Sequence, residues 1–207
     1  MPKELIRTAS SSSEKEHRLA RSKPKHRFGE GGRSLPVVMI SQEMIDEAVR
    51  LIPFTKVKRT IASSVDTLTG HLGEFAFAHY YFGDWKKHRV GKNKGETDFP
   101  DIEIKTSAFP FSEKLNLLVR EDYAAKRKPA YYVQIIVAVD SETVKEIPAH
   151  TKAILCGFAT ASEVDSAPLK DFGSKFGRKG GYKCRYISLK RLHPIQELLQ
   201  KKKMTSL

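Results

Sequence analysis

The segment Tyr131–Val139 constrains the fold of this chain most, because it is almost continuously apolar and rich in β-branched and aromatic residues. A strand with one face in water alternates apolar and polar residues, whereas an unbroken apolar strand is typical of a sheet covered on both faces. We therefore expect this segment to form a central strand. Similar but shorter patterns predict further strands at 102–106, 115–119, 153–158 and 186–188.

Two long helical patterns precede these strands. Apolar residues at helical spacing between Ser41 and Pro53 predict a helix over 41–52, with Ser41 as its N-cap and Pro53 as its end. Residues 65–82 predict a second helix, whose apolar stripe comprises Leu68, Leu72, Phe75, His79 and Phe82. Short helices are expected at 120–126, 161–166 and 194–201. This order predicts an α/β fold with a central mixed β-sheet flanked by helices.

Positive charge dominates the composition. Of the 207 residues, 37 are Lys or Arg and 24 are Asp or Glu, and the formal net charge is +13. Such an excess indicates a polyanionic partner, with nucleic acid favoured over a membrane surface. The two cysteines supply no disulfide framework, and no apolar run reaches the ~20 residues of a membrane span. Because the first residues also lack a secretory pattern, we expect a cytoplasmic protein with no membrane partner.

The charge is unevenly distributed along the chain. Residues 1–35 hold nine Lys and Arg but four Glu, together with a serine run and few large apolar side chains. Such a segment buries too little surface to offset the entropy lost on ordering. We therefore predict a disordered basic tail over 1–38, which either contacts nucleic acid or is simply solvated. The folded domain is expected over 39–203.

Basic side chains recur in two further segments. One contains Lys86, Lys87, Arg89, Lys92 and Lys94, and the other contains Lys175, Arg178 and Lys179 among glycines and aromatic residues. Aromatic rings beside cations are typical of surfaces that bind nucleic acids. These residues, with Arg120, are the candidate contacts to a nucleic acid. A solvated loop is the alternative interpretation of each segment.

The sequence Phe99-Pro100-Asp101-Ile102 favours a β-turn, because Pro and Asp occupy its second and third positions. This turn places Asp98 opposite Glu103, and cross-strand partners share one side of a hairpin. Lys105, two residues beyond Glu103, lies on that side as well.

Two carboxylates and one ammonium on one side of a strand pair favour metal-dependent phosphodiester chemistry. The carboxylates repel each other unless a cation lies between them, and oxygen ligands of this kind suit Mg²⁺ or Mn²⁺. A lysine beside the metal can hold a water molecule and stabilise negative charge. The alternative is a cross-strand salt bridge on an exposed hairpin, which contributes little to stability.

Asp98 followed by Glu103-Ile104-Lys105 resembles the acidic signature of the PD-(D/E)XK nuclease superfamily, and Gly70–Ala76 is similar to the first core helix of that family. The resemblance implies a restriction-endonuclease-like core over 39–203 and Mg²⁺-dependent hydrolysis of DNA, or less often RNA. It makes Asp98, Glu103 and Glu74 metal ligands, with the Ile104 main-chain carbonyl as a further one. It also makes Lys105 the catalytic lysine.

One feature departs from the family pattern. The literal Pro-Asp pair is Pro100-Asp101, only two residues before Glu103, so Asp101 is the alternative to Asp98 as the metal ligand. Gln134 resembles a polar residue that some members place near the site, although a core hydrogen bond is the simpler interpretation.

We therefore expect a Mg²⁺- or Mn²⁺-dependent nuclease, an endonuclease rather than an exonuclease, that acts on DNA in the cytoplasm of a prokaryotic or phage-infected cell. A homodimer is one arrangement open to it. The alternative is a non-catalytic nucleic-acid-binding protein on the same fold, and a basic structural protein of a particle is a third interpretation.

Overall fold

The computed structural model describes residues 25–29, 32–55, 64–91, 96–121, 129–141, 143–172 and 183–205. Its strands are β1 (Lys25–Phe28), β2 (Arg33–Met39), β3 (Ile102–Phe109), β4 (Asn116–Arg120), β5 (Tyr131–Ala138), β6 (Lys152–Thr160), β7 (Leu169–Asp171) and β8 (Lys183–Ser188). The α-helices are α2 (Gln42–Thr55), α3 (Ser64–Phe82), α5 (Ala161–Ser166) and α6 (Ile195–Thr205). Two short 3₁₀ helices are η1 (Trp85–Lys87) and η2 (Leu189–Arg191).

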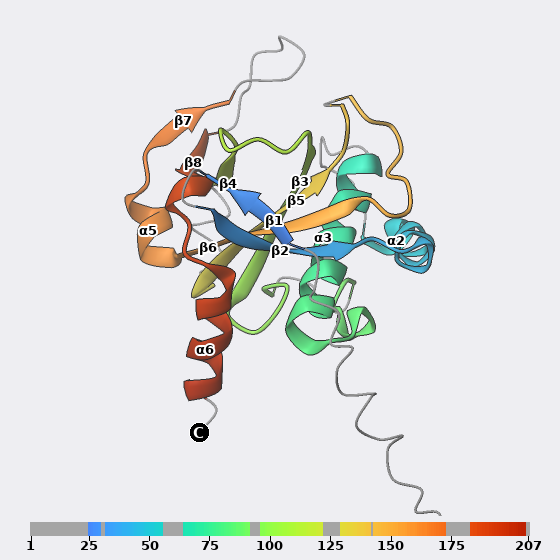
Figure 1. Ribbon diagram of the computed structural model, residues 1–207, viewed down its shortest axis with the longest axis horizontal. Coiled ribbons are helices and arrows are strands. Elements are labelled where there is room, and N and C mark those ends of the chain that lie inside the picture. The colour runs from blue at the N-terminus through green and yellow to red at the C-terminus, as the bar shows by residue number, and fades with distance from the viewer. Residues whose placement is uncertain are drawn as a thin grey trace, which may run out of the picture.

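Five strands form the main sheet, in the order β1-β2-β6-β5-β3. β3 runs parallel to β5, whereas the pairs β5–β6, β6–β2 and β2–β1 are antiparallel. A smaller sheet has the order β4-β8-β7 and is antiparallel throughout. The predicted α/β fold with a central mixed sheet flanked by helices is confirmed, as Figure 1 shows.

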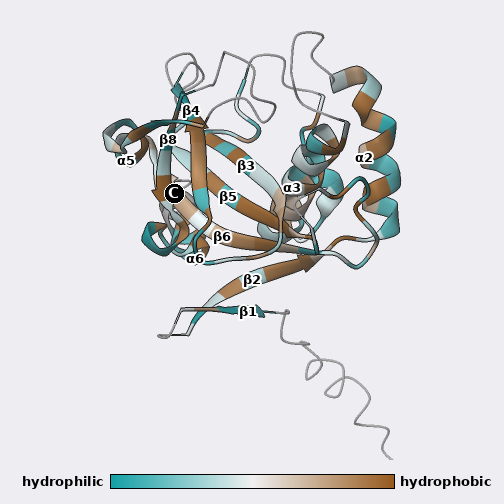
Figure 2. Cartoon of the chain, turned by 90° about the horizontal axis from the view of Figure 1, so that it is seen from above, coloured by the Kyte–Doolittle hydropathy of each residue, from teal (hydrophilic) through white to brown (hydrophobic). Residues whose placement is uncertain are grey.

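The main sheet separates two hydrophobic cores (Figure 2). On one side, α2 and α3 pack against it, and buried residues of this core include Leu72, Phe75 and Ile135. On the other side, the smaller sheet covers it through residues such as Leu117 and Ile187. β5 contributes to both cores, which explains why its sequence is apolar without alternation.

The expected N-terminal boundary of the folded domain is wrong. Residues 25–28 and 33–39 are strands of the main sheet, although the predicted disordered tail extends to residue 38. Arg33 shows why the charge pattern is misleading there, because its guanidinium is used inside the fold. It donates to the carbonyl oxygens of Leu192 at 2.6 Å and Cys156 at 2.7 Å. Residues 1–24 lie outside the described residues.

The other elements differ from expectation mainly at their ends. Ser41 caps α2 as predicted, because its hydroxyl accepts from the Met44 N–H at 3.2 Å. Pro53 does not end α2, which continues to Thr55. The short strand β7 has no counterpart among the predicted elements. The helix expected over 120–126 lies mostly outside the described residues. In the described part of the chain, no helix combines the length and apolarity needed to cross a bilayer.

Helix α3 approaches β3 very closely at Gly73. A Cβ atom at this position would overlap the Thr106 hydroxyl and lie 2.7 Å from the Cβ and Cγ2 of Thr106. No such obstacle exists at Gly70, one turn earlier, where a Cβ would meet nothing within 4 Å. Gly73 therefore sets the spacing between α3 and β3. Two neighbouring residues depend on that spacing: Glu74, which follows Gly73 on the helix, and Lys105, which precedes Thr106 on the strand.

Candidate active site

The predicted turn before β3 is present and fixes the position of Asp98. Phe99 and Ile102 exchange two backbone hydrogen bonds, of 3.0 and 2.9 Å. Asp101 lies at the turn with a φ of 61°, a left-handed conformation that Asp tolerates. Its side chain is exposed, whereas the Asp98 Oδ2 accepts from the Ile104 N–H at 2.7 Å. The structure therefore brings Asp98, and not Asp101, against β3.

Glu103 and Lys105 form an ion pair on β3. The Lys105 Nζ donates to the Glu103 Oε1 at 2.9 Å. Glu103 is only 9 % exposed. Its second oxygen, Oε2, is buried and has no hydrogen-bond partner among the residues that the structure describes. Because a buried carboxylate oxygen without a partner is costly, it indicates a site built to receive a further group.

Glu74 completes an acidic cluster from the helix side. Burial raises the pKa of its carboxyl well above the ordinary value, and the charges of Asp98 and Glu103 raise it further. The three carboxyl groups thus come from α3, the turn and β3, and the charges of Asp98 and Glu103 disfavour ionisation of Glu74. Only the tertiary structure joins Glu74 to the other two acids.

The pKa of Glu74 gives a testable dependence of stability on pH. Between the ordinary value of 4.5 and the raised folded-state value, the folded chain keeps a proton that the unfolded chain has lost. The free energy of unfolding therefore falls as pH rises through this interval. We expect Glu74→Gln to stabilise the metal-free protein more at pH 8 than at pH 4.5. Urea unfolding in EDTA measures this difference, and the exposed Glu146→Gln is the control. An equal effect at both pH values would contradict it.

The backbone of β3 adds a main-chain oxygen to this cluster. Both the N–H and the C=O of Ile102 bond to Phe99, on the side of β3 away from β5. Alternate residues of a strand repeat this direction, and the Ile104 N–H indeed donates to Asp98. The Ile104 carbonyl therefore points to the same free edge as the acids, as a main-chain ligand would require.

The oxygen atoms of these residues are suitable ligands for a hard divalent cation, but their side chains are not arranged around a common point. Carboxylate and carbonyl oxygens are the ligands that Mg²⁺ and Mn²⁺ prefer. No group of three or more His, Cys, Asp or Glu side chains within the described ranges is arranged to hold a metal ion. One Asp98 oxygen instead accepts from the Ile104 N–H, and one Glu103 oxygen accepts from Lys105. The Glu103 Oε2, which has no hydrogen-bond partner among the described residues, nevertheless offers an oxygen that could bind a metal ion.

Two residues of β5 share the face of Glu103 and Lys105. The parallel register places Tyr132 beside Glu103 and Gln134 beside Lys105. Gln134 is buried, and its amide donates to the Ile135 carbonyl at 3.0 Å, where the register between β5 and β6 shifts. This bond agrees with the simpler interpretation of Gln134, a hydrogen bond within the core. Burial raises the pKa of Tyr132 to about 12, with contributions from the nearby Glu103 and Asp165. Sequence reasoning missed Tyr132, because it requires the register of a non-local strand pair.

The described candidate contacts to nucleic acid belong to two segments, one at η1 and one at the end of β4. Lys86 and Lys87 are exposed on η1, and Arg89 follows them. Lys86 pairs with Glu43 at 2.8 Å, and Arg89 pairs with Glu96 at 3.5 Å. Arg120 is exposed at the end of β4, in the smaller sheet. The remaining candidates lie outside the described residues: Lys92, Lys94, Lys175, Arg178 and Lys179.

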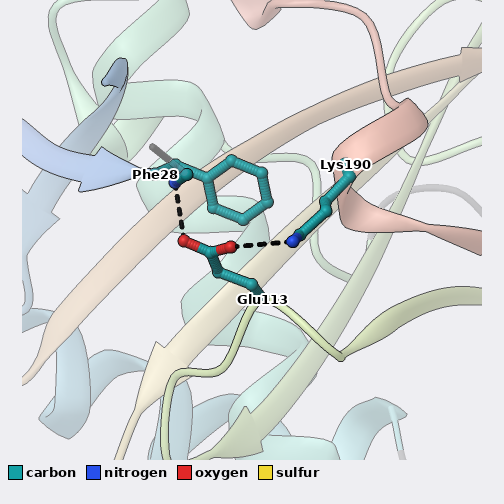
Figure 3. Close-up of a pocket in the computed structure, with 4 residues that line it drawn as sticks. Phe28, Glu113 and Lys190 are labelled. Atoms are coloured by element: carbon teal, nitrogen blue, oxygen red, sulfur yellow. Dashed lines mark hydrogen bonds and ion pairs between the residues drawn. The ribbon is translucent and has the colours of Figure 1, made fainter. Parts of the chain in front are cut away.

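The acidic cluster lines neither of two surface pockets. The larger, of about 710 Å³, is lined by Phe28, Gly29, Glu113 and Lys190. Figure 3 shows Glu113 bridging its two sides, because it accepts from the Gly29 N–H at 2.6 Å and pairs with Lys190 at 3.1 Å. This carboxylate fastens the end of β1 to η2, which gives it a structural role. The smaller pocket lies between α2 and η1.

Comparisons with protein-family models, with curated proteins and with solved structures return no match to this chain. Any statement about its function therefore rests on its own residues and their geometry.

Proposed function

We propose that this protein is a Mg²⁺- or Mn²⁺-dependent nuclease of the PD-(D/E)XK type that hydrolyses phosphodiester bonds of DNA, as an endonuclease. The observation that carries the proposal is the edge of β3. There the charges of Asp98 and Glu103 act on Glu74, Glu103 pairs with Lys105, and a buried oxygen of Glu103 has no partner among the described residues. An ordinary exposed salt bridge does not account for this burial.

Each residue has a definable task. Glu103, Asp98 and Glu74 would hold the metal ion, with the Ile104 carbonyl as a further ligand. When bound, that ion lowers the pKa of a water molecule and neutralises part of the phosphate charge. Lys105 would then leave Glu103 to orient the attacking water and to stabilise the negative charge that develops on the phosphate. The positive charge of the domain favours approach of the DNA backbone, which the acids alone would repel.

A nuclease panel tests the proposal. The protein is incubated with supercoiled plasmid, linear duplex, single-stranded and branched DNA, and with RNA, in Mg²⁺, in Mn²⁺ and in EDTA. We expect nicking of the plasmid in Mn²⁺ and none in EDTA, with DNA cleaved faster than RNA. Nicking of closed circles identifies an endonuclease. If no nucleic acid is cut in either metal, the protein is not a nuclease.

The second candidate function is nucleic-acid binding without catalysis. The observation that favours it is the absence, among described residues, of side chains arranged for a metal ion. It predicts salt-dependent binding of DNA that survives Glu103→Gln, and no cleavage in the panel. Sedimentation of the protein with and without DNA tests for the homodimer, which two-strand cleavage would use.

Asp98 and Asp101 are distinguished by paired substitutions. Asp98→Asn keeps an oxygen that accepts from Ile104 but removes the charge, so we expect cleavage in Mn²⁺ to fall about 100-fold. Asp101→Asn keeps a residue that tolerates a φ of 61°, so activity should be retained. Initial rates of plasmid nicking measure both. An inactive Asp101→Asn beside an active Asp98→Asn would transfer the metal-binding role to Asp101.

A further inference from the structure

Phe82, the last residue of α3, lies at the surface although the sequence pattern places it on the buried stripe of the helix. It is 42 % exposed, whereas Leu68, Leu72 and Phe75 of that stripe are buried. Gly83 follows with a φ of 76° and ends the helix. An aromatic ring is therefore presented to solvent where α3 stops.

The ring of Phe82 is joined to the turn that carries Asp98. Its centroid lies 6.0 Å from that of Phe99, and Tyr81 contacts it edge-on at 4.7 Å. Phe99 follows Asp98 directly and is hydrogen-bonded to Ile102. Because neighbouring rings support it, Phe82 is a fixed surface feature beside the candidate active site rather than an isolated apolar residue.

A cation lies over this ring. The Lys87 Nζ is 5.9 Å from the Phe82 centroid. Lys86 and Arg89, in the same segment, are each paired with a carboxylate, whereas the contact that the structure shows for Lys87 is the aromatic ring. A ring with an ammonium group over one face can offer its other face to a flat base, while the ammonium group attracts a phosphate.

The distance from the acids suits a strand of DNA. Glu74 and Phe82 are eight residues apart on α3, which is about 12 Å along the helix axis. The duplex rise of about 3.4 Å per nucleotide spans this distance in three to four nucleotides, and a more extended unpaired strand spans it in fewer. A strand with a phosphate at the acids therefore has a base within reach of Phe82.

We propose that Phe82 and Lys87 form a stacking platform for an unpaired base, so that the protein prefers single-stranded or locally unpaired DNA. The position of the strand in this inference rests on the proposed nuclease function. A paired base inside a duplex has both faces covered by its neighbours, so only an unpaired base can stack on the ring. Phe54 on α2 is more exposed, at 74 %, but no ring or cation contacts it among the described residues, so it serves as the control.

Binding in EDTA tests the platform without cleavage. Fluorescence anisotropy compares a labelled single strand of about 20 nucleotides, longer than the ~4–16 nucleotides of a typical binding site, with the blunt duplex of the same sequence. We expect Phe82→Leu to weaken single-strand binding roughly tenfold and to leave duplex binding unchanged. Phe82→Trp should keep the wild-type affinity, and so should Phe54→Leu. Lys87→Ala should reduce the slope of the logarithm of the binding constant against the logarithm of the salt concentration by about one.

A second measurement uses only the wild-type protein, so it does not depend on how a variant folds. A single strand with abasic sites in place of its bases should bind about tenfold more weakly than the normal strand. Equal binding of the two strands, equal losses for single strand and duplex in Phe82→Leu, or no DNA binding would each overturn the platform. Base stacking without cleavage would support the platform and refute the nuclease. Cleavage without base stacking would support the nuclease and refute the platform.

Discussion

Replacement of Lys105 by Met is expected to lower the rate of Mn²⁺-dependent plasmid nicking about a thousand-fold. The ammonium group contacts Glu103 at 2.9 Å, and the charge of Glu103 in turn acts on Glu74. No other described lysine or arginine forms an ion pair with Glu103. Loss of a single positioned donor at a developing oxyanion costs on the order of 10²–10³ in rate, and loss of a proton-transfer group adds to this.

The controls separate chemistry from folding. Lys105→Met leaves a buried carboxylate without its cation, which lowers stability. The double variant Lys105→Met with Glu103→Gln removes that charge and should regain stability but not activity. Lys145→Met, at an exposed lysine away from the described site, should keep wild-type activity. Thermal unfolding and nicking rates are measured for all three. Retention of a tenth or more of the wild-type rate in Lys105→Met would refute the role of Lys105.

Gly73→Ala is expected to lower the free energy of unfolding by about 3 kcal/mol, because the added methyl group overlaps Thr106. The conflict is relieved only if α3 moves away from β3. Since Glu74 follows Gly73 and Lys105 precedes Thr106, such a movement also separates the groups of the candidate site. We therefore expect nicking activity to fall together with stability. Urea unfolding and nicking assays measure the two effects.

Gly70→Ala is the matched control on the same helix. A Cβ at Gly70 meets nothing within 4 Å, and Ala favours a helix over Gly by about 1 kcal/mol, so this variant should be more stable than wild type. Adding Thr106→Ala to Gly73→Ala should restore part of the lost free energy of unfolding. It removes the hydroxyl and methyl groups of Thr106 that the new Cβ would meet, but not the Thr106 Cβ. A cycle of the two variants measures the coupling. Equal stability of the two Gly→Ala variants would show that α3 and β3 are not held at this spacing.

The local part of the site was predictable from the sequence. The pairing of Phe99 with Ile102 follows from the Pro-Asp turn, and the position of Asp98 follows from the pairing. These relations span only a few residues, and turn chemistry together with the two-residue period of a strand decides them. The inclusion of Glu74 came from a resemblance, since spacing within the sequence does not bring α3 to this edge.

The boundary of the folded domain was not predictable from charge. Arg33 belongs to a basic stretch that is typical of a solvated tail, yet it donates to backbone carbonyls of two distant segments. Val37 and Val38 of the same strand are buried. Composition measures how much apolar surface a segment can bury by itself, but β2 is stabilised by pairing with β6, more than a hundred residues later in the sequence.

By itself, the sequence determined the α/β class, the central strand β5, and the turn that pairs Phe99 with Ile102, because each depends on neighbouring residues and on fixed periods of the backbone. Only the tertiary structure decided which elements meet. It brought Glu74 to the two acids, placed Tyr132 beside Glu103, and left Phe82 exposed next to Lys87. These contacts depend on parallel strand pairing, on the close approach at Gly73, and on the end of α3 at Gly83, where packing between distant segments decides the outcome.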